Sequence, residues 1–491
     1  MPVNQRTRQL GFSFGTAEVS PQEDVDGVAG GVLSLPATRA KPKPKVREKQ
    51  VVSATMEEVC ERLEPAFEQV AANKGAPGPD RQSIEQVRKQ LPTLLPKLRA
   101  ALLDGNYRPG DVRRVWIPKA GDGGQRGLGI PNVIDRTVQE AVRQVLEPVY
   151  EPTFHEASHG FRPNRSCHTA IEAAKQHIDE GYEWVVDLDL ENFFNRVNHQ
   201  RLLSRLSQRV RDRRMLVLIA RMLKARIVMP DGVKVSNEEG VPQGGPLSPL
   251  LSNIVLDELD WELDRRGHRF VRYADDENIY VRSERAGQRV MASVSAFIEK
   301  RLRLKVNTSK SAVARPEERH FLGFRLRREP LDGKVEVLLS KRTRERIDTR
   351  IRELTPRTWG NALDACLLAL NVYIRGWVGF FGICTERVEP VLGTLDAHIR
   401  RRLRAIQLRH WKRKRTIARR LIQRGVKPST AWRTVYGGRK STWALSHTPA
   451  VDRALRNGHW TARGLLSLRD LWREKNAPGI AAPVQLALPL G

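Results

Sequence analysis

The sequence predicts an α+β fold in which an antiparallel sheet carries carboxylates and is followed by basic helices. Residues 269–281 place β-branched and aromatic residues on both sides of an Ala-Asp-Asp-Glu break, which predicts a hairpin with acids at its bend. Residues 184–194 predict a second acidic strand. Beyond Lys341 the chain becomes helical and basic, and it has no Asp or Glu from 397 to 451.

The second acidic strand presents carboxylates on one face. With a period of two, Val186, Leu188 and Leu190 share one side, while Asp187 and Asp189 share the other. The spacing does not choose between the two acids. Carboxylates gathered in this way need a cation, and two Mg²⁺ ions can clamp the attacking and leaving oxygens of phosphoryl transfer. The pattern indicates polymerase chemistry, although the hairpin alone also fits a solvated turn.

Composition favours a globular protein with an anionic partner. The 491 residues suggest three or four compact units, and 40% hydrophobic residues can supply their cores. A net charge of +29 favours nucleic acid over membrane, because the most apolar region, 362–383, is broken by Asp364, Asn371 and Arg375. Four scattered cysteines without a Cys-x-x-Cys pair predict a reducing cytoplasm and no zinc site.

Ordered motifs carry a family resemblance. The string Tyr273-Ala274-Asp275-Asp276 follows Asp189-x-x-x-x-Phe194 and the Gly-Val-Pro-Gln-Gly-Gly-Pro-Leu-Ser-Pro string at 240–249, with further blocks at 126–131, 158–166 and 321–324. Over residues 55–475 the chain resembles the bacterial group II intron reverse transcriptase/maturase family. Roughly 40 residues after the basic helices lack paired cysteines or a His/Asn cluster, so we expect the type without a C-terminal endonuclease domain.

The resemblance implies a right-hand polymerase, with fingers, an antiparallel palm sheet and thumb, followed by a helical, basic maturase domain. The expected divisions are a disordered leader at 1–54, N-terminal extension and fingers at 55–180, palm with finger elements at 181–335, thumb at 336–395, maturase/RNA-binding domain at 396–475 and a tail at 476–491.

The resemblance also assigns the catalytic centre. It selects Asp189 over Asp187 and joins it to Asp275 and Asp276 as catalytic residues. These three acids and Leu190 are the expected ligands of two Mg²⁺ ions. Asn195 stands where many relatives carry a second Asp, which leaves the level of polymerase activity open.

Nucleotide and template contacts are implied in the same way. Lys119 and Arg126 are expected to contact the phosphates of the incoming nucleotide, with Lys310 a further candidate; Gln243 would touch the nucleotide, and Phe194 would pack under its sugar and exclude a 2′-hydroxyl. Arg162 and Arg165 would lie beside template and primer. Surface charge in ordinary loops is the alternative for these cations.

The basic helices predict RNA binding. An apolar helical stripe there is covered on other faces by cations of one sign, and aromatic residues are interleaved, which suits phosphate contacts with stacking on unpaired bases. A purely structural basic helix is the alternative. The expected nucleic-acid-binding residues are Arg400, Arg404, Lys412, Arg413, Lys414, Arg415, Arg419 and Arg420, and the aromatics are Trp411, Trp432, Tyr436 and Trp443.

We therefore expect an RNA-directed DNA polymerase that also binds its group II intron RNA, assists splicing and supports mobility by target-primed reverse transcription in the bacterial cytoplasm. Its partners would be intron RNA, a DNA target or primer, and dNTPs, without a membrane; the oligomeric state stays open. The alternatives are a host-adopted reverse transcriptase in defence or repair, and an RNA-binding splicing factor on a polymerase scaffold.

Overall fold

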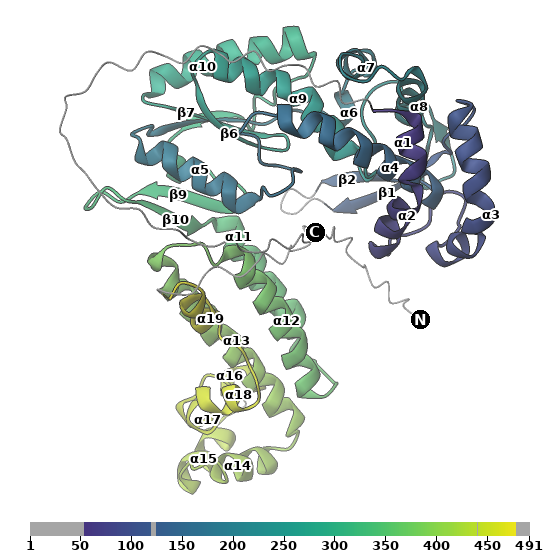
Figure 1. Cartoon of the computed structure of the whole chain (residues 1–491). Helices are drawn as coiled ribbons and strands as arrows, with labels where there is room; N and C mark the ends of the chain where they lie inside the picture. Colours follow the sequence, from purple (N-terminus) through teal and green to yellow (C-terminus); the bar gives the residue numbers. More distant parts are fainter. Residues whose placement is uncertain (1–53, 119–123, 439, 478–491) are drawn as a thin grey trace, which may run out of the picture.

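Two lobes make up the part of the chain that the computed structural model describes, residues 54–118, 124–438 and 440–477. An upper body holds the sheets, and an elongated helical lobe runs away from it from α11 onward (Figure 1). The predicted leader (1–54) and tail (476–491) lie almost wholly outside the described residues, so the disorder of the leader and the assignment of the tail stay predictions.

The palm sheet contains both acidic strands. Its strand order is β6-β7-β3-β8, and every pairing is antiparallel. The predicted hairpin is confirmed, because Tyr273 pairs with Asp276 across a two-residue bend. The strands are β3 (Trp184–Leu188), β6 (Arg269–Tyr273), β7 (Asp276–Val281) and β8 (Ala312–Ala314).

Both faces of this sheet are covered. Val186 and Leu188 enter the larger core with helices α9 (Ser248–Arg265) and α10 (Glu284–Phe297). Val185 enters the second core, where helix α5 (Cys167–Asp179) packs on the opposite face. The predicted alternation of sides is therefore confirmed. Because covered faces have little room for ions, the acids cluster where the strands end.

The fingers sheet has the order β2-β1-β4-β5. Strands β1 (Val112–Pro118) and β2 (Gln125–Ile130) pair antiparallel, which confirms the predicted cationic hairpin, and β1 pairs in parallel with β4 (Ile227–Val228), which is followed by β5 (Lys234–Val235). Lys119 lies outside the described residues. The surrounding helices are α1 (Met56–Glu61), α2 (Leu63–Ala72), α3 (Ile84–Leu103), α4 (Val133–Tyr150), α6 (Phe193–Arg196), α7 (His199–Ser207) and α8 (Arg213–Leu223).

The helical lobe shares the second core with the palm. Strands β9 (Phe324–Arg328) and β10 (Val335–Leu339) form a hairpin that leads into it, so the expected palm–thumb boundary at 335/336 falls at the start of a strand. The expected boundary at 395/396 falls inside α13. The helices are α11 (Lys341–Leu354), α12 (Leu363–Phe381), α13 (Glu389–His410), α14 (Lys414–Ile422), α15 (Pro428–Tyr436), α16 (Thr442–Leu445), α17 (Pro449–Ala454), α18 (Asn457–Ala462) and α19 (Leu468–Lys475).

Helix α12 is the one helix of the described ranges that is long and apolar enough to cross a membrane, by length and composition only. One side of it, with Cys366, Leu370 and Ile374, is buried in the second core. A helix in the core of this lobe requires one buried apolar side of this kind.

Helix α9 carries a partly buried acid whose ionisation opposes folding. Burial, and then the charge of Asp260, raise the pKa of Asp257 to about 6 although Arg205 lies 3.3 Å away. The ordinary value is 3.8, so the folded protein holds this proton to higher pH than the unfolded chain. The resulting stabilisation is fully present below pH 3.8 and is lost as the pH rises through 6; its size is on the order of 3 kcal/mol.

Replacing Asp257 with Asn should therefore flatten the fall in melting temperature between pH 4 and pH 7, because Asn cannot ionise. Thermal unfolding of wild type and variant across this range measures it. The exposed Asp264 of the same helix is the control, and Asp264→Asn should keep the wild-type slope. A parallel slope in Asp257→Asn would show that Asp257 does not titrate as described.

Candidate active site

The acidic bend sits in a strained turn at the end of the palm hairpin. Ala274 has φ 57°, a left-handed conformation that costs an L-residue roughly 1–2 kcal/mol. The turn places Asp275 at the bend and Asp276 at the first position of β7. The side chain of Arg272, in β6, stabilises this strained turn by a hydrogen bond to the Ala274 carbonyl.

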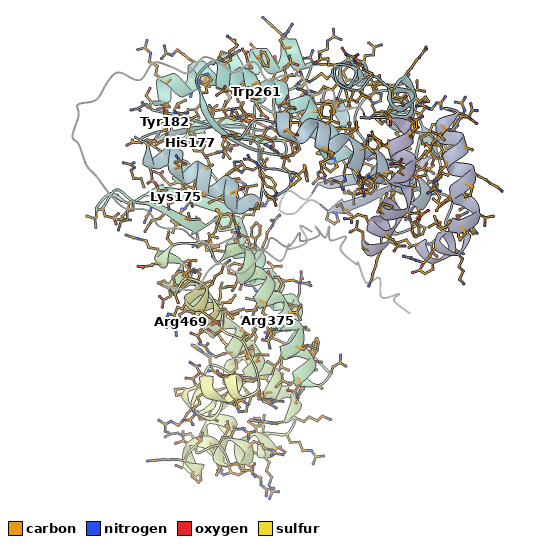
Figure 2. All side chains as sticks on the ribbon, in the orientation of Figure 1. Lys175, His177, Tyr182, Trp261, Arg375 and Arg469 are labelled. Atoms are coloured by element: carbon orange, nitrogen blue, oxygen red, sulfur yellow. The ribbon has the colours of Figure 1, made fainter. Side chains whose placement is uncertain are left out.

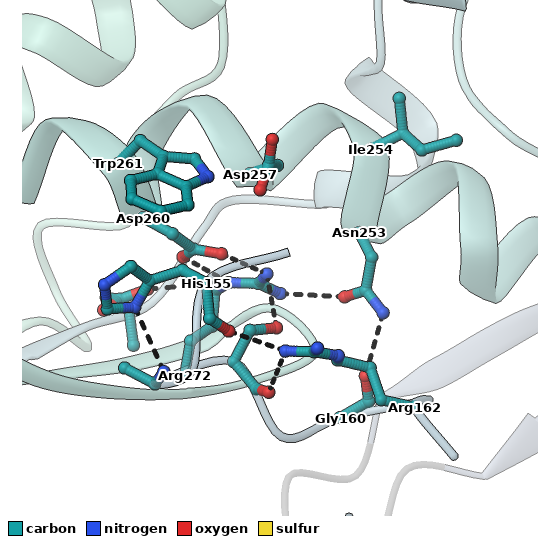
Figure 3. Close-up of polar contacts among 12 residues, drawn as sticks. His155, Gly160, Arg162, Asn253, Ile254, Asp257, Asp260, Trp261 and Arg272 are labelled. Carbon is teal, nitrogen blue, oxygen red and sulfur yellow. Dashed lines mark hydrogen bonds and ion pairs between the residues drawn. The ribbon is translucent and has the colours of Figure 1, made fainter. Parts of the chain in front are cut away.

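Arg272 is the centre of a buried hydrogen-bond network (Figure 3). Its side chain is 1% exposed and forms a two-pronged ion pair with Asp260 of α9, at 2.7 Å from Nε and 2.5 Å from Nη2. Nη1 donates to the carbonyl oxygen of Ala274 at 2.9 Å and to Oδ1 of Asn253 at 3.0 Å, and Nη2 donates to Oγ of Ser158 at 2.7 Å. Through the bond to the Ala274 carbonyl, the network holds the acidic bend in place.

Gly160 brings the 158–166 block against the same bend. A Cβ on Gly160 would lie 2.2 Å from the backbone nitrogen of Ala274, so no larger residue fits there. Asn253 donates to the carbonyl of Gly160 at 2.9 Å, and the backbones of Ser158 and Arg272 form a parallel bridge. The sequence marked this block as a family motif but gave no sign that its glycine lies under the acidic turn.

Asp189 lies one residue past the end of β3. Its backbone N–H donates to Oγ of Ser311 at 3.0 Å, and its carbonyl accepts from the N–H of Asn307 at 2.8 Å. Leu190 then bridges to Val306. The loop at 307–311, which contains Lys310, therefore holds the backbone of Asp189 in place.

Burial and the charges of neighbouring acids raise the pKa values of Asp275 and Asp276. Burial raises the pKa of Asp275; the charge of Arg126 lowers it and that of Asp189 raises it. Asp276 keeps contact with solvent, yet the surrounding protein and then the charges of Asp275, Asp187 and Asp189 raise its pKa to about 7. Among the described residues Asp189, Asp275 and Asp276 form no ion pair, so the cluster holds an excess of negative charge.

This donor set fits a hard divalent cation, which prefers carboxylate oxygens and would relieve the repulsion. The side chains do not already converge, because no group of three His, Cys, Asp or Glu side chains within the described ranges is arranged to hold a metal ion. The cluster supplies the ligand chemistry but not a finished coordination geometry.

Asp187 has a different environment from Asp189. Arg319 binds it through Nε at 2.8 Å and Nη2 at 2.6 Å, and also donates to the carbonyl of Lys310. Burial nevertheless raises the pKa of Asp187. Asp187 is therefore an ion-paired residue of strand β3.

The fingers meet the palm at the glycine-rich 240–249 segment. Arg126 Nε donates to Oε1 of Gln243 at 2.7 Å, and the Gly129 N–H donates to the carbonyl of Gln243 at 2.6 Å. Gly244 has φ 119°, and a Cβ there would lie 2.4 Å from the Gly129 carbonyl oxygen. Two of the expected nucleotide-binding residues, Arg126 and Gln243, are thus in direct contact with each other.

The same segment reaches the expected sugar-contacting residue. The Val241 N–H donates to the carbonyl of Phe194 at 2.6 Å, next to Asn195. Phe194 is mostly buried and meets Phe193 edge to face, with ring centroids 5.2 Å apart. Gln243 and Phe194 are therefore linked through the segment 241–243 and this hydrogen bond.

Two arginines expected to bind nucleic acid are structural in this fold. Arg162 is buried, is ion-paired with Glu151 at 2.9 Å and donates to the carbonyls of His155 and Ser158 (Figure 3). Arg404 is buried, ion-paired with Asp452 and bonded to the Leu455 carbonyl. Their donors face protein acceptors, contrary to the expected contacts with phosphate.

The other expected cations are more accessible. Arg165 and Arg400 are half-buried, and Arg165 donates to the Glu156 carbonyl. Side chains with nitrogen tips extend from the far end of the helical lobe, where α14 and α15 lie (Figure 2). The exposed cations there are Lys412, Arg413, Lys414, Arg415, Arg419 and Arg420.

Comparison with known proteins agrees with this geometry. The reverse transcriptase (RNA-dependent DNA polymerase) family matches residues 117–326, and the group II intron, maturase-specific domain matches residues 344–425. Among solved structures, a chain of a partial Cas6-RT-Cas1–Cas2 complex covers 50% of this chain and 42% of its own length at TM-score 0.33 and 24% identity, which is too distant to carry an argument.

Two of the proteins to which this chain is similar indicate its family. Protein YkfC of Escherichia coli (strain K12) is 33% identical over 331 residues, which are 59% of this chain and 86% of YkfC. The group II intron-encoded protein LtrA of Lactococcus lactis subsp. cremoris is 39% identical over 202 residues, 40% of this chain and 32% of LtrA. The chain belongs to the bacterial group II intron reverse transcriptase/maturase family, whose enzyme activity is RNA-directed DNA synthesis.

Proposed function

We propose that Asp189, Asp275 and Asp276 form the polymerase centre, bind two Mg²⁺ ions with the backbone of Leu190, and extend a primer on an RNA template. The observation that carries this is the meeting of the acidic bend with the end of β3, opposite Arg126, whose charge acts on Asp275. Bound cations would polarise the primer 3′-hydroxyl and offset charge on the phosphates.

The protein's own part in the reaction is positioning and exclusion. Arg126 would exchange its bond to Gln243 for a phosphate of the incoming nucleotide, which frees Gln243 to contact that nucleotide. Lys119 and Lys310 would add phosphate contacts, and Phe194 would occupy the space that a 2′-hydroxyl needs. Arg165 remains the candidate for template contact in the 158–166 block.

The helical lobe is proposed to bind the group II intron RNA and assist its splicing. Support comes from the exposed cations of one sign at its end and from the match to the maturase-specific domain. The primer would be nicked target DNA, as target-primed mobility requires. The four cysteines are free and buried, which supports a reducing cytoplasm as the location.

Asp189→Asn should lower primer extension about a thousand-fold or more, because it removes a metal ligand whose contribution is on the order of 4 kcal/mol. Extension of a primed RNA template with Mg²⁺ measures this. Asp187→Asn is the matched control on the same strand, since Arg319 already occupies that acid. Equal loss in both variants would contradict the choice of Asp189.

Replacing Phe194 with Val should raise ribonucleotide incorporation about ten-fold, since a smaller side chain leaves room for the 2′-hydroxyl. Single-nucleotide incorporation with matched dNTP and rNTP gives the ratio. Phe193→Leu changes the neighbouring core ring and should leave the ratio unchanged. An unchanged ratio in Phe194→Val would show that Phe194 only fills the core.

Polymerisation and splicing should separate by mutation. Asp275→Ala should abolish DNA synthesis and leave intron binding and splicing largely intact. Replacing Arg413, Lys414 and Arg415 with Gln should weaken intron binding and splicing more than it weakens DNA synthesis. Each lost phosphate contact lowers the magnitude of the salt slope of binding by about 0.7 to 0.9.

Both variants are compared by primer extension, by assisted splicing and by binding at several salt concentrations. Arg265→Gln is the charge control, because Arg265 is exposed on α9 and is paired with Glu262. Splicing that fails in a folded Asp275→Ala protein would mean that the palm and the basic helices are not separate working parts.

A further inference from the structure

Helix α15 exposes an aromatic pair at the far end of the helical lobe. Trp432 is 37% exposed and Tyr436 is 50% exposed; they stand one turn apart, with ring centroids 5.5 Å apart and an angle of 34° between the rings. The buried side of α15 uses Ala431 and Val435 instead. The pair therefore contributes little to the core, and it lies beyond residue 425, where the match to the maturase-specific domain ends.

Other aromatics of the basic region are already covered by arginine. The guanidinium of Arg424 lies 5.1 Å from the Trp411 ring centroid. Trp443 is half-buried, with Arg401 at 4.0 Å and Arg357 at 5.6 Å. Each of these two rings already has an arginine over it, whereas among the described residues a single cation, Lys414, lies over the ring of Tyr436 and none lies over that of Trp432.

That cation belongs to a surface of one charge sign. Lys414 Nζ lies 5.6 Å from the Tyr436 ring centroid. In the described part of the chain, the surrounding exposed cations form no ion pair with an acid, and the nearby Asp452 is occupied by Arg404. These exposed cations are Lys412, Arg413, Lys414, Arg415, Arg419, Arg420, Lys427 and Arg433.

We propose that Trp432 and Tyr436 form a stacking site for unpaired bases of RNA, with Lys414 and its neighbours contacting the adjoining phosphates. This rests on the proposed RNA-binding role of the lobe and assigns it a particular subsite. Ring faces beside unneutralised cations suit a strand whose bases are free to stack, whereas bases in a duplex already stack on each other. A protein partner would have to bring an acidic group for each of these cations, whereas RNA supplies a phosphate at every nucleotide.

Full-length protein is tested with two RNA probes of equal phosphate number, a single-stranded oligouridylate and a blunt-ended, fully paired duplex. The Trp432→Ala/Tyr436→Ala double variant should bind the single strand about 5- to 150-fold more weakly. Its salt slope should stay unchanged, because no cation is removed. Duplex binding should also stay unchanged, and Trp432→Phe/Tyr436→Phe should keep the affinity because both rings remain.

Trp261→Ala is the control for loss of an exposed aromatic. Trp261 is 49% exposed on α9 in the upper body, away from the helical lobe (Figure 2). It should bind both probes as the wild type does. Photocrosslinking of a 4-thiouridine strand should label residues 428–436 in the wild type.

The outcomes distinguish this proposal from the broader one. If the wild type binds neither RNA, both the basic surface and the stacking site are wrong. If the wild type binds both and the double Ala variant is unchanged, only the stacking site is overturned, and the pair is left to another partner such as a protein. Equal weakening of binding to both probes would also overturn the stacking site, because stacking on unpaired bases requires a larger loss of affinity for the single strand than for the paired RNA.

Discussion

The two-pronged pair between Arg272 and Asp260 holds together the parts of the palm on which the active site depends. Both side chains are fully enclosed, so each charge is tolerated only with the other; removing one partner of such a pair costs about 3–5 kcal/mol. Burial lowers the pKa of Arg272, but Asp260 more than offsets it, and the pKa is raised. The guanidinium thus remains a cation with enough donors to tie α9, the 158–166 block and the acidic bend together.

Glu277 is a second buried acid beside this pair. It lies 4.0 Å from Arg272, and its carboxyl oxygens have no hydrogen-bond partner among the described residues. Burial, and then the charge of Asp260, raise its pKa well above the ordinary value. The strain at Ala274 persists because its carbonyl oxygen is held by Arg272, which is how a surrounding network can maintain an unfavourable backbone conformation at a working site.

The sequence predicted what depends on local pattern and failed where a contact joins distant segments. Alternation of side chains was enough to place Val186 and Val185 on opposite faces, and the acidic dyad was enough to place the bend. It could not distinguish Arg162 and Arg404 from the exposed cations, because burial is set by packing partners that are remote in the chain. Nor could spacing show that Asp260, twelve residues before Arg272, supplies the charge that keeps it buried. The family motifs marked these regions without giving a physical reason for them.

The acidic cluster and the cationic lobe place opposite electrostatic requirements in different parts of the chain. The palm gathers acids at strand ends, where burial and then the charges of neighbouring acids raise the pKa of Asp276 to about 7; a cation would relieve this repulsion. Among the described residues, the cations at the far end of the lobe have no acidic partner, and an anionic polymer can relieve their repulsion. A single mixed surface would neutralise itself through internal ion pairs, as Arg319 and Asp187 already do beside the palm. Keeping the two kinds of charge on separate elements therefore leaves the acids available to the proposed metal ions and the cations available to the proposed nucleic-acid partner.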